Sequence, residues 1–289
     1  MDHTRGAAGE TMRTPLLTIP GLLLALAAGA GPAAGGQVSA DYAAWFIGIP
    51  IGRGTLTANV DGTSYRTQVS GRVTGIAALF VGGSGTAEAN GRLAGTAPVP
   101  VQFRAEVRSG GKVETTRIAM AGGNVQSVER NPDKPPHPRA TPVLPEHLRG
   151  VLDPLSAGVF IAGGSGPVTG AAACERRTRI YNGVYRFDLV YAFVATRQVE
   201  IAGYKGDAAI CSVRFEPIAG FRADRSDIQS ARRRSAELTL VPVAGSRALI
   251  PARVSLSTGY GHGLLEATRL DLDPARPAAR PPARRASAD

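Results

Sequence analysis

The chain has 289 residues, of which 43% are hydrophobic and 19% charged, and it carries a formal net charge of +10. This length accommodates one large or two small domains, and the net charge serves either solubility or attraction to an anionic partner. The four histidines and two cysteines show no H-x-x-x-H or C-x-x-C spacing, which argues against a metal site, and nothing in the sequence indicates a cofactor.

An apolar run near the N-terminus predicts export. Arg13 precedes the run at 16–30, and small residues follow it, as in a secretory signal peptide. The run is shorter than the roughly 20 residues that a membrane-spanning helix needs, and an uncleaved anchor is the alternative. We expect a signal peptide over residues 1–36 with cleavage near 34–40, a start at Met1 or Met12, and a periplasmic mature protein.

The first half of the mature domain has the pattern of antiparallel strands. Asp61-Gly62 is a hairpin signal between alternating runs at 54–60 and 63–71. An apolar patch at 76–81 suggests a turn or short helix. Further strands are predicted at 85–92, 101–107, 112–120 and 124–129, with glycine-rich turns between them. Consecutive short strands with one apolar face indicate a meander.

The pattern stops in a proline-rich segment at 131–150, which cannot lie inside a sheet and reads as an ordered or semi-ordered crossover. After it, Asp153 can cap one or two helical turns that begin at Pro154. We therefore expect one short helix here, packed against an apolar surface of the sheet.

Strands return in the second half. Asn182-Gly183 is a hairpin signal, and a row of residues on one face of a long strand follows it: Tyr185, Phe187, Leu189, Tyr191 and Phe193. Tyr185, Phe187 and Tyr191 are candidate ligand or partner contacts, although such a row is more often core. Later strands are expected at 208–215, 236–244, 247–258 and 264–272, and the Pro/Arg-rich tail 274–289 should be disordered.

These patterns predict a mainly β protein with roughly 11–13 strands. Residues 37–273 are expected to form a single strongly curved antiparallel sheet, or open spiral β-barrel, with one short helix. Two separate β domains are the alternative. A helix laid in the concave face of such a sheet would leave an apolar cleft.

The two cysteines are Cys174 and Cys211, 37 positions apart. In an oxidising compartment an even cysteine count favours a disulfide, and two buried free thiols are the alternative.

Arginines gather in the sequence around Cys211 and beyond it. They form either a patch for an acidic partner or solvated loop charge: Arg214, Arg222, Arg232, Arg233 and Arg234. Nucleic acid is an improbable partner for an exported protein without interleaved aromatic residues.

No catalytic residues are predicted. Asp153 is most simply a cap, Asp188 should face outward, and Glu216 precedes a proline. The serine-containing loops at 82–88 and 162–170 lack the G-x-S-x-G elbow. A hydrolase, resting on Asp153, Glu216 and His262, is the minor alternative.

Several motifs in order resemble the family called domain of unknown function 3108 (DUF3108). They run from IGIPIGRGTLTANVDG through RGVLDPLSA and NGVYRFDL to YKGDAAICSVRFEPIAGFR, and the resemblance covers Asp41 to Leu272. It implies an exported β-rich protein of Gram-negative bacteria, supports pairing of Cys174 with Cys211, and brings no catalytic residues. It also implies a half-barrel or spiral barrel, similar in shape to periplasmic lipid or lipoprotein carriers.

The sequence therefore leads to one main functional hypothesis, a non-enzymatic periplasmic envelope protein that binds a lipid-like ligand or an envelope partner. The alternative is a scaffold module for envelope assembly that uses its basic surface. Either protein would make at most peripheral contact with a membrane.

Overall fold

The computed structural model describes residues 36–60, 63–79 and 82–272. All of them belong to the second of the two units into which the chain divides, Ala33–Asp289. The predicted signal segment, except for Gly36, lies outside the described residues. So do the Asp61-Gly62 turn and the predicted disordered tail at 274–289.

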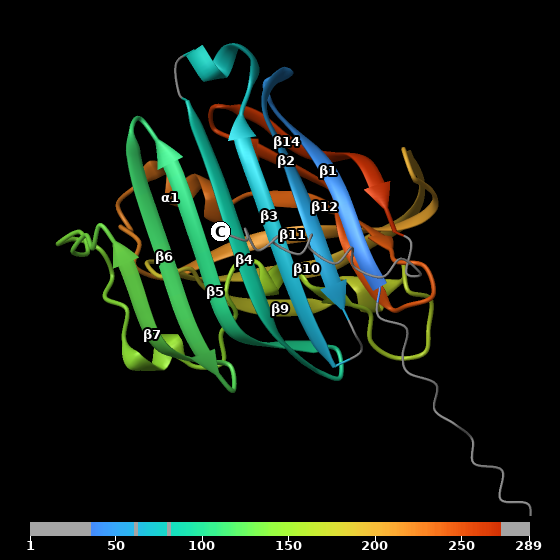
Figure 1. Ribbon diagram of the computed structural model, residues 1–289, viewed down its shortest axis with the longest axis horizontal. Helices are drawn as coiled ribbons and strands as arrows, with labels where there is room; N and C mark the ends of the chain where they lie inside the picture. The colour runs from blue at the N-terminus through green and yellow to red at the C-terminus, as the bar shows by residue number, and fades with distance from the viewer. Residues whose placement is uncertain (1–35, 61–62, 80–81, 273–289) are drawn as a thin grey trace, which may run out of the picture. The chain divides into compact units, whose positions relative to one another are not determined.

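The first seven strands form a meander in which each strand pairs with the next, as the alternating patterns predicted (Figure 1). The strands are β1 (Gly36–Phe46), β2 (Ile49–Val60), β3 (Ser64–Val73), β4 (Gly83–Ala94), β5 (Ala97–Ser109), β6 (Lys112–Ala121) and β7 (Asn124–Asn131). The predicted turn or helix after β3 is a 3-10 helix, η1 (Gly75–Leu79).

The later strands continue the same sheet, because β14 pairs with β1. They are β8 (Phe160–Ile161), β9 (Arg176–Tyr181), β10 (Arg186–Ile201), β11 (Tyr204–Ala219), β12 (Ser235–Pro242), β13 (Ala248–Thr258) and β14 (Gly261–Asp271). The strand order is β7-β6-β5-β4-β3-β2-β1-β14-β13-β12-β11-β10-β9, with β8 beside β13. The prediction of one antiparallel sheet that does not close is confirmed, with 14 strands where the patterns gave 11–13.

The one α-helix among the described residues is α1 (Ser226–Arg232), in the stretch that the sequence marked only as a basic loop. The helical turns predicted after Asp153 are shorter, a 3-10 turn η3 (Ser156–Gly158). Asp153 still caps it, since its Oδ1 accepts the backbone N–H groups of Leu155 and Ser156, each at 3.0 Å. Two other 3-10 turns are η2 (Pro145–Leu148) and η4 (Ala171–Ala173).

The two edge strands, β7 and β9, are connected through a short segment that follows the proline-rich crossover. The Val151 N–H donates to the carbonyl of Gly123 in the β6–β7 turn, at 2.8 Å. Leu152 forms a parallel bridge with Ile180 in β9. The crossover itself pairs with the end of β11, where the Gly220 N–H donates to the Thr141 carbonyl at 2.7 Å. These bonds satisfy part of the edge backbone that an open sheet leaves unpaired.

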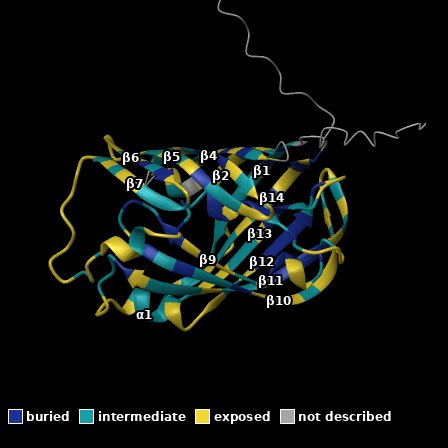
Figure 2. Ribbon diagram, turned by 90° about the horizontal axis from the view of Figure 1, so that it is seen from below, coloured by how far each residue is buried: buried dark blue, intermediate teal, exposed yellow. Residues whose placement is uncertain are grey.

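Buried residues form three clusters. Figure 2 shows buried positions alternating with more exposed ones along the strands. One cluster joins β1 to β11–β14 and contains Val38, Ala40 and Leu270. A second surrounds the cysteines, and a third packs Phe103 and Ile118 of the meander against Val151 and Tyr181. The interior is thus distributed along a curved sheet instead of collected at one centre.

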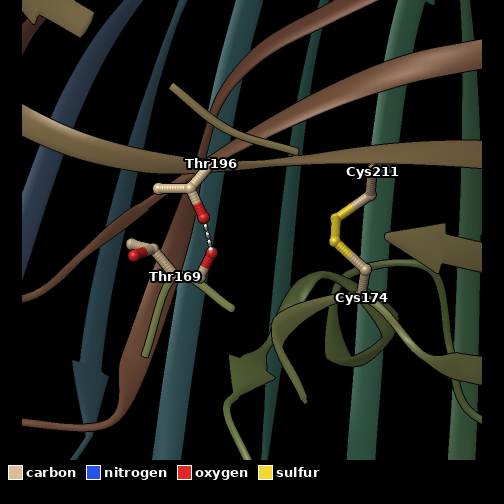
Figure 3. The surroundings of a disulfide bond; sticks show 4 residues. All are labelled: Thr169, Cys174, Thr196 and Cys211. Carbon is tan, nitrogen blue, oxygen red and sulfur yellow. Dashed lines mark hydrogen bonds between the residues drawn. A yellow bond between two sulfur atoms is a disulfide. The ribbon is translucent and has the colours of Figure 1, made fainter. Parts of the chain in front are cut away.

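Cys174 and Cys211 form a disulfide with a Cα–Cα distance of 5.5 Å, which confirms the predicted pairing (Figure 3). Both residues are fully buried. Cys211 lies on β11, and Cys174 directly follows η4, two residues before β9 begins. Beside the disulfide, the Thr196 hydroxyl donates to the Thr169 carbonyl at 2.8 Å. Together they hold the loop before β9 against the inner face of the sheet.

Candidate functional site

A cavity of about 1060 Å³ lies between strands β10–β13, the η3 region and α1. Its sheet wall consists of alternating apolar side chains: Phe187, Leu189, Tyr191, Val213, Phe215, Leu238, Val254 and Leu256. Ligand sites for small molecules usually have volumes of about 300–1,000 Å³ and a mainly apolar lining. The size and lining of this cavity suit a ligand with a large apolar part.

The sheet wall follows directly from strand register. In β10, Phe187, Leu189 and Tyr191 alternate onto one face, and Leu189 and Tyr191 lie opposite Phe215 and Val213 of β11. Directly opposed residues in antiparallel strands share a face, so both rows point into the same space. The row ends at Phe193, where a bulge interrupts the pairing.

The facing wall is formed by Pro154, Ala157, Gly158 and Phe160. Behind it, the Arg176 guanidinium lies 3.6 Å above the Phe160 ring centroid and 5.2 Å from that of Tyr191. Cation–π contacts of this kind strengthen when they are shielded from water. Burial lowers the pKa of Arg176 to about 10, so the group remains a cation at neutral pH. Arg176 thereby fixes two aromatic rings of the cavity wall.

Polar groups line the cavity at one end only. They come from α1, from the connection after it and from the end of β13: Ser226, Asp227, Ser230, Arg234, Ser257 and Thr258. Arg234 connects the two elements, because its Nη1 donates to the Thr258 carbonyl at 3.0 Å and its Nε to the Ser230 hydroxyl at 3.1 Å. Arg225 lies 2.5 Å from Asp227 and lowers the pKa of that carboxyl. The cavity is therefore amphipathic along its length.

The structure brings together only some of the sequence-predicted contact residues. Phe187 and Tyr191 line the cavity. Tyr185 does not, because the Asn182 side chain accepts the N–H groups of Val184 and Tyr185, and the resulting loop delays the start of β10 to Arg186. The Tyr185 ring instead stacks on Phe221 with centroids 4.5 Å apart.

The five arginines predicted as a possible patch also separate into residues that line the cavity and residues that do not. Arg214 lies on β11 within 3.2 Å of Glu216, and Arg222 pairs with Asp224 at 3.0 Å. Neither residue lines the cavity, whereas Arg234 does. Arg232 and Arg233 are exposed at the end of α1. These five residues therefore do not form one patch directed at a single partner.

Sequence reasoning missed the contribution of α1 to the site. Ile228 and Ala231 line the cavity from this helix. Their spacing of three residues is the signal for an apolar helix face, but it is short and surrounded by arginines. Phe160, in the two-residue strand β8, gives no periodic signal at all.

The family model described as "Protein of unknown function (DUF3108)" matches residues 37–268 of this chain. The chain belongs to the DUF3108 family. Curated proteins give no match to it. Among solved structures it is similar to a β-barrel-like protein of domain of unknown function DUF1849 from Brucella abortus, with a TM-score of 0.47 and 10% sequence identity over 82% of this chain and 98% of that chain.

For Asp188 of this DUF3108 chain, the alternation pattern predicted the correct face of the strand but not the burial of the side chain. It lies on the face opposite Phe187 and Leu189, as predicted, but it is only 3% exposed and is not solvated. Arg177 pairs with it at 2.8 Å, and Arg186 forms a second, closer pair. Arg177 also reaches Glu216 at 2.6 Å. The two carboxylates are thus held by arginines on the outer face of the sheet, away from the cavity.

The three residues of the hydrolase alternative do not meet. Asp153 is buried and bonded to Ser156, Glu216 lies on the outer face of β11, and His262 on β14 is 3.4 Å from the Ser255 hydroxyl. None of them lines the cavity. Across the described parts of the chain, no group of three His, Cys, Asp or Glu residues could hold a metal ion. The same residues include no helix long and apolar enough to cross a membrane.

Asp153 supports the cavity wall from beneath. Its carboxylate accepts a hydrogen bond from the Ser156 hydroxyl, which in turn accepts one from the Tyr65 hydroxyl at 2.6 Å. Both Asp153 and Ser156 are fully buried. Burial raises the pKa of Asp153, and the hydrogen bonds from Ser156 and Leu155 oppose that shift. The folded state therefore binds a proton at Asp153 more tightly than the unfolded chain does.

We compare the free energy of unfolding of Asp153→Asn with that of the parent. We expect the variant to be more stable relative to the parent at pH 7 than at pH 4. Because the folded pKa is raised above its ordinary value near 3.8, the stability contributed by this carboxyl is greatest below that pH and is lost as the pH rises through the folded pKa. Asparagine keeps the acceptor but does not titrate. Urea unfolding of both proteins at the two pH values measures the difference, and a difference independent of pH would contradict the account.

Asp153→Ala serves as the control for the hydrogen bonds. It leaves the N–H groups of Leu155 and Ser156 without their acceptor. Because neither variant titrates at this position, we expect Asp153→Ala to be less stable than Asp153→Asn by about 1–3 kcal/mol at both pH values.

Proposed function

We propose that this DUF3108 chain is an exported, non-enzymatic protein of the cell envelope that holds a lipid-like ligand in the cavity between β10–β13 and α1. The observation that carries the proposal is the cavity of about 1060 Å³ with its continuous apolar wall. Filling it with water would leave the aromatic and aliphatic side chains hydrated, which costs free energy in proportion to the apolar area. An apolar ligand removes that cost.

The proposed location in the periplasm rests on the signal-like N-terminus and on the disulfide. Disulfides persist mainly in oxidising compartments, and Cys174 and Cys211 are paired. β1 begins at Gly36 and contributes Val38 and Ala40 to the core. We therefore place signal cleavage near Ala34, since cleavage near Ala40 would remove both core residues.

The distribution of polar groups sets the orientation of the proposed ligand. Its apolar part would lie against Phe187, Leu189 and Phe215, and its polar end would face Ser230 and Arg234 at the α1 end of the cavity. A molecule with one acyl or similarly apolar chain and one polar or anionic head fits this arrangement. A ligand that is polar throughout would leave the sheet wall without a partner.

Ala236→Trp should lower the affinity for a fluorescent fatty acyl probe at least on the order of tenfold. Ala236 lines the cavity from β12, and an indole there would occupy the volume that the chain of the probe needs. The measurement is titration of the delipidated protein with the probe. Ala192→Trp is the matched control, because Ala192 is exposed on β10 and does not line the cavity.

Native mass spectrometry of the protein extracted gently from the periplasm gives an independent test. A bound lipid that is absent from Ala236→Trp would support the ligand site. Wild-type protein that carries no lipid and also takes up no acyl probe would reject the proposed function.

A further inference from the structure

Beside the polar end of the cavity, two hairpin turns present exposed apolar side chains. Ile47 and Ile49 belong to the β1–β2 turn and are 60% and 48% exposed, and Tyr260 in the β13–β14 turn is 77% exposed. The turns are adjacent, because the Ile47 N–H donates to the His262 carbonyl at 2.8 Å. Phe46 and Tyr260, one from each hairpin, also line the cavity. We name Ile47, Ile49 and Tyr260 the apolar tip.

Ile47 stands in a backbone conformation that disfavours it. Its φ is +51° and that of Gly48 is +75°, and the two residues form the loop between the paired residues Phe46 and Ile49. Positive φ at both central positions is the pattern of a type I′ turn, where Asn, Asp or Gly is preferred. A β-branched residue there is an outlier that costs on the order of 1–3 kcal/mol. The side chain packs over Gly261 of the β13–β14 turn but remains largely exposed, so packing in the described domain offsets only part of this cost.

Unpaired positive charge lies next to the apolar tip. The stretch 222–234 contains five arginines and two aspartates, which leaves a net charge of +3. Both aspartates are paired, Asp224 with Arg222 and Asp227 with Arg225. Arg232 and Arg233 are exposed, and no ion pair among the described residues includes either one. Arg234 and Ser230 link this end of α1 to the β13–β14 turn through Thr258 and Gly259.

We propose that the apolar tip, with Arg232 and Arg233, docks on an anionic lipid surface and places the mouth of the cavity against it. Apolar side chains that enter the headgroup region, together with cations that meet anionic headgroups, are the two contributions by which peripheral proteins bind membranes. Phe46, Tyr260 and Arg234 line the cavity beside the tip and the cations, and this position at the opening of an apolar cavity favours a lipid surface as the occupant. The docking is independent of ligand uptake, while its use for loading or unloading rests on the proposed ligand site.

The test is binding of the protein recovered after export to vesicles of phosphatidylcholine with and without phosphatidylglycerol. We expect binding to the anionic vesicles only, weakened by salt. Ile47→Asn should reduce it roughly tenfold through loss of buried apolar area, without loss of stability because Asn is favoured at positive φ. Arg232→Glu with Arg233→Glu should reduce it at least on the order of thirtyfold.

Trp45, the single tryptophan of the chain, lies two residues before Ile47, and its emission is recorded during the vesicle titration beside direct vesicle sedimentation. Matched controls are Val107→Asn, at a site 50% exposed on β5, and the pair Arg92→Glu with Arg197→Glu on β4 and β10. Both controls should bind vesicles as the parent does.

The outcomes separate the two proposals. Loss of vesicle binding in the tip and arginine variants, with acyl probe affinity in solution unchanged, supports docking. Equal binding to both kinds of vesicle, or equal loss in the controls, overturns it. Absence of vesicle binding by the parent overturns docking but leaves the ligand site intact if probe uptake persists. Dimer dissociation in Ile47→Asn would assign the tip to self-association and equally overturn docking.

Discussion

Replacing both Cys174 and Cys211 by serine should lower the free energy of unfolding by about 4 kcal/mol. The disulfide closes a loop of 37 positions, and the chain-entropy model assigns roughly this value to a loop of that length. Single domains are typically stable by about 5–15 kcal/mol, so the loss is a large share of the total. The measurement is urea unfolding of the double variant, and of the parent with and without reductant.

The same double replacement should also lower the affinity of the candidate site for the acyl probe. The disulfide belongs to the cluster that contains Phe160, Tyr191 and Leu238, all of which line the cavity. Thr196→Val is the local control, because it removes only the hydrogen bond to Thr169 beside the disulfide and should cost about 1 kcal/mol. Parent protein that unfolds identically with and without reductant would show that the cross-link contributes nothing.

The sequence was sufficient for the sheet and the disulfide because both depend on local or compositional signals. Alternation along β10 placed Phe187, Leu189 and Tyr191 on one face, and register with β11 then built the cavity wall. An even cysteine count, in a chain that the sequence predicts to be exported, limited Cys174 to one partner. The Gly-rich turns marked the hairpins, as at Gly110 and Gly111, which both have positive φ between β5 and β6.

The features that the sequence did not predict depend mostly on contacts between distant segments of the chain. β1 was not predicted because its apolar residues directly follow the segment interpreted as a signal peptide, and β8 has only two residues. The burial of Asp188 depends on Arg177, which reaches it from the neighbouring strand β9. The role of α1 depends on Ile228 facing strands that lie elsewhere in the chain. Charge and pattern within one segment cannot encode such partners.

The curved sheet brings the β10–β11 turn against β14 at one glycine, Gly203. Gly203 has a φ of +90°, and a Cβ added there would lie 1.8 Å from the backbone carbonyl oxygen of Leu270. The Leu270 N–H also donates to the Ala202 carbonyl at 2.7 Å. β10 and β14 are separated by three strands in the sheet order, so this contact exists only because the sheet curls.

Gly203→Ala should therefore cost about 3 kcal/mol or more, from unfavourable positive φ together with overpacking against backbone. Neither the turn nor the Leu270 carbonyl can relieve the overlap by a side-chain rotation, so the hairpin must move away from β14. That movement would open the cluster of Val38, Val241 and Leu270. Gly95→Ala is the matched control, since Gly95 has a φ of +62° with no atom within 4 Å, and only the backbone term of about 1 kcal/mol applies. Equal losses for the two variants in urea unfolding would mean that the contact between the β10–β11 turn and β14 does not hold the sheet in its curved form.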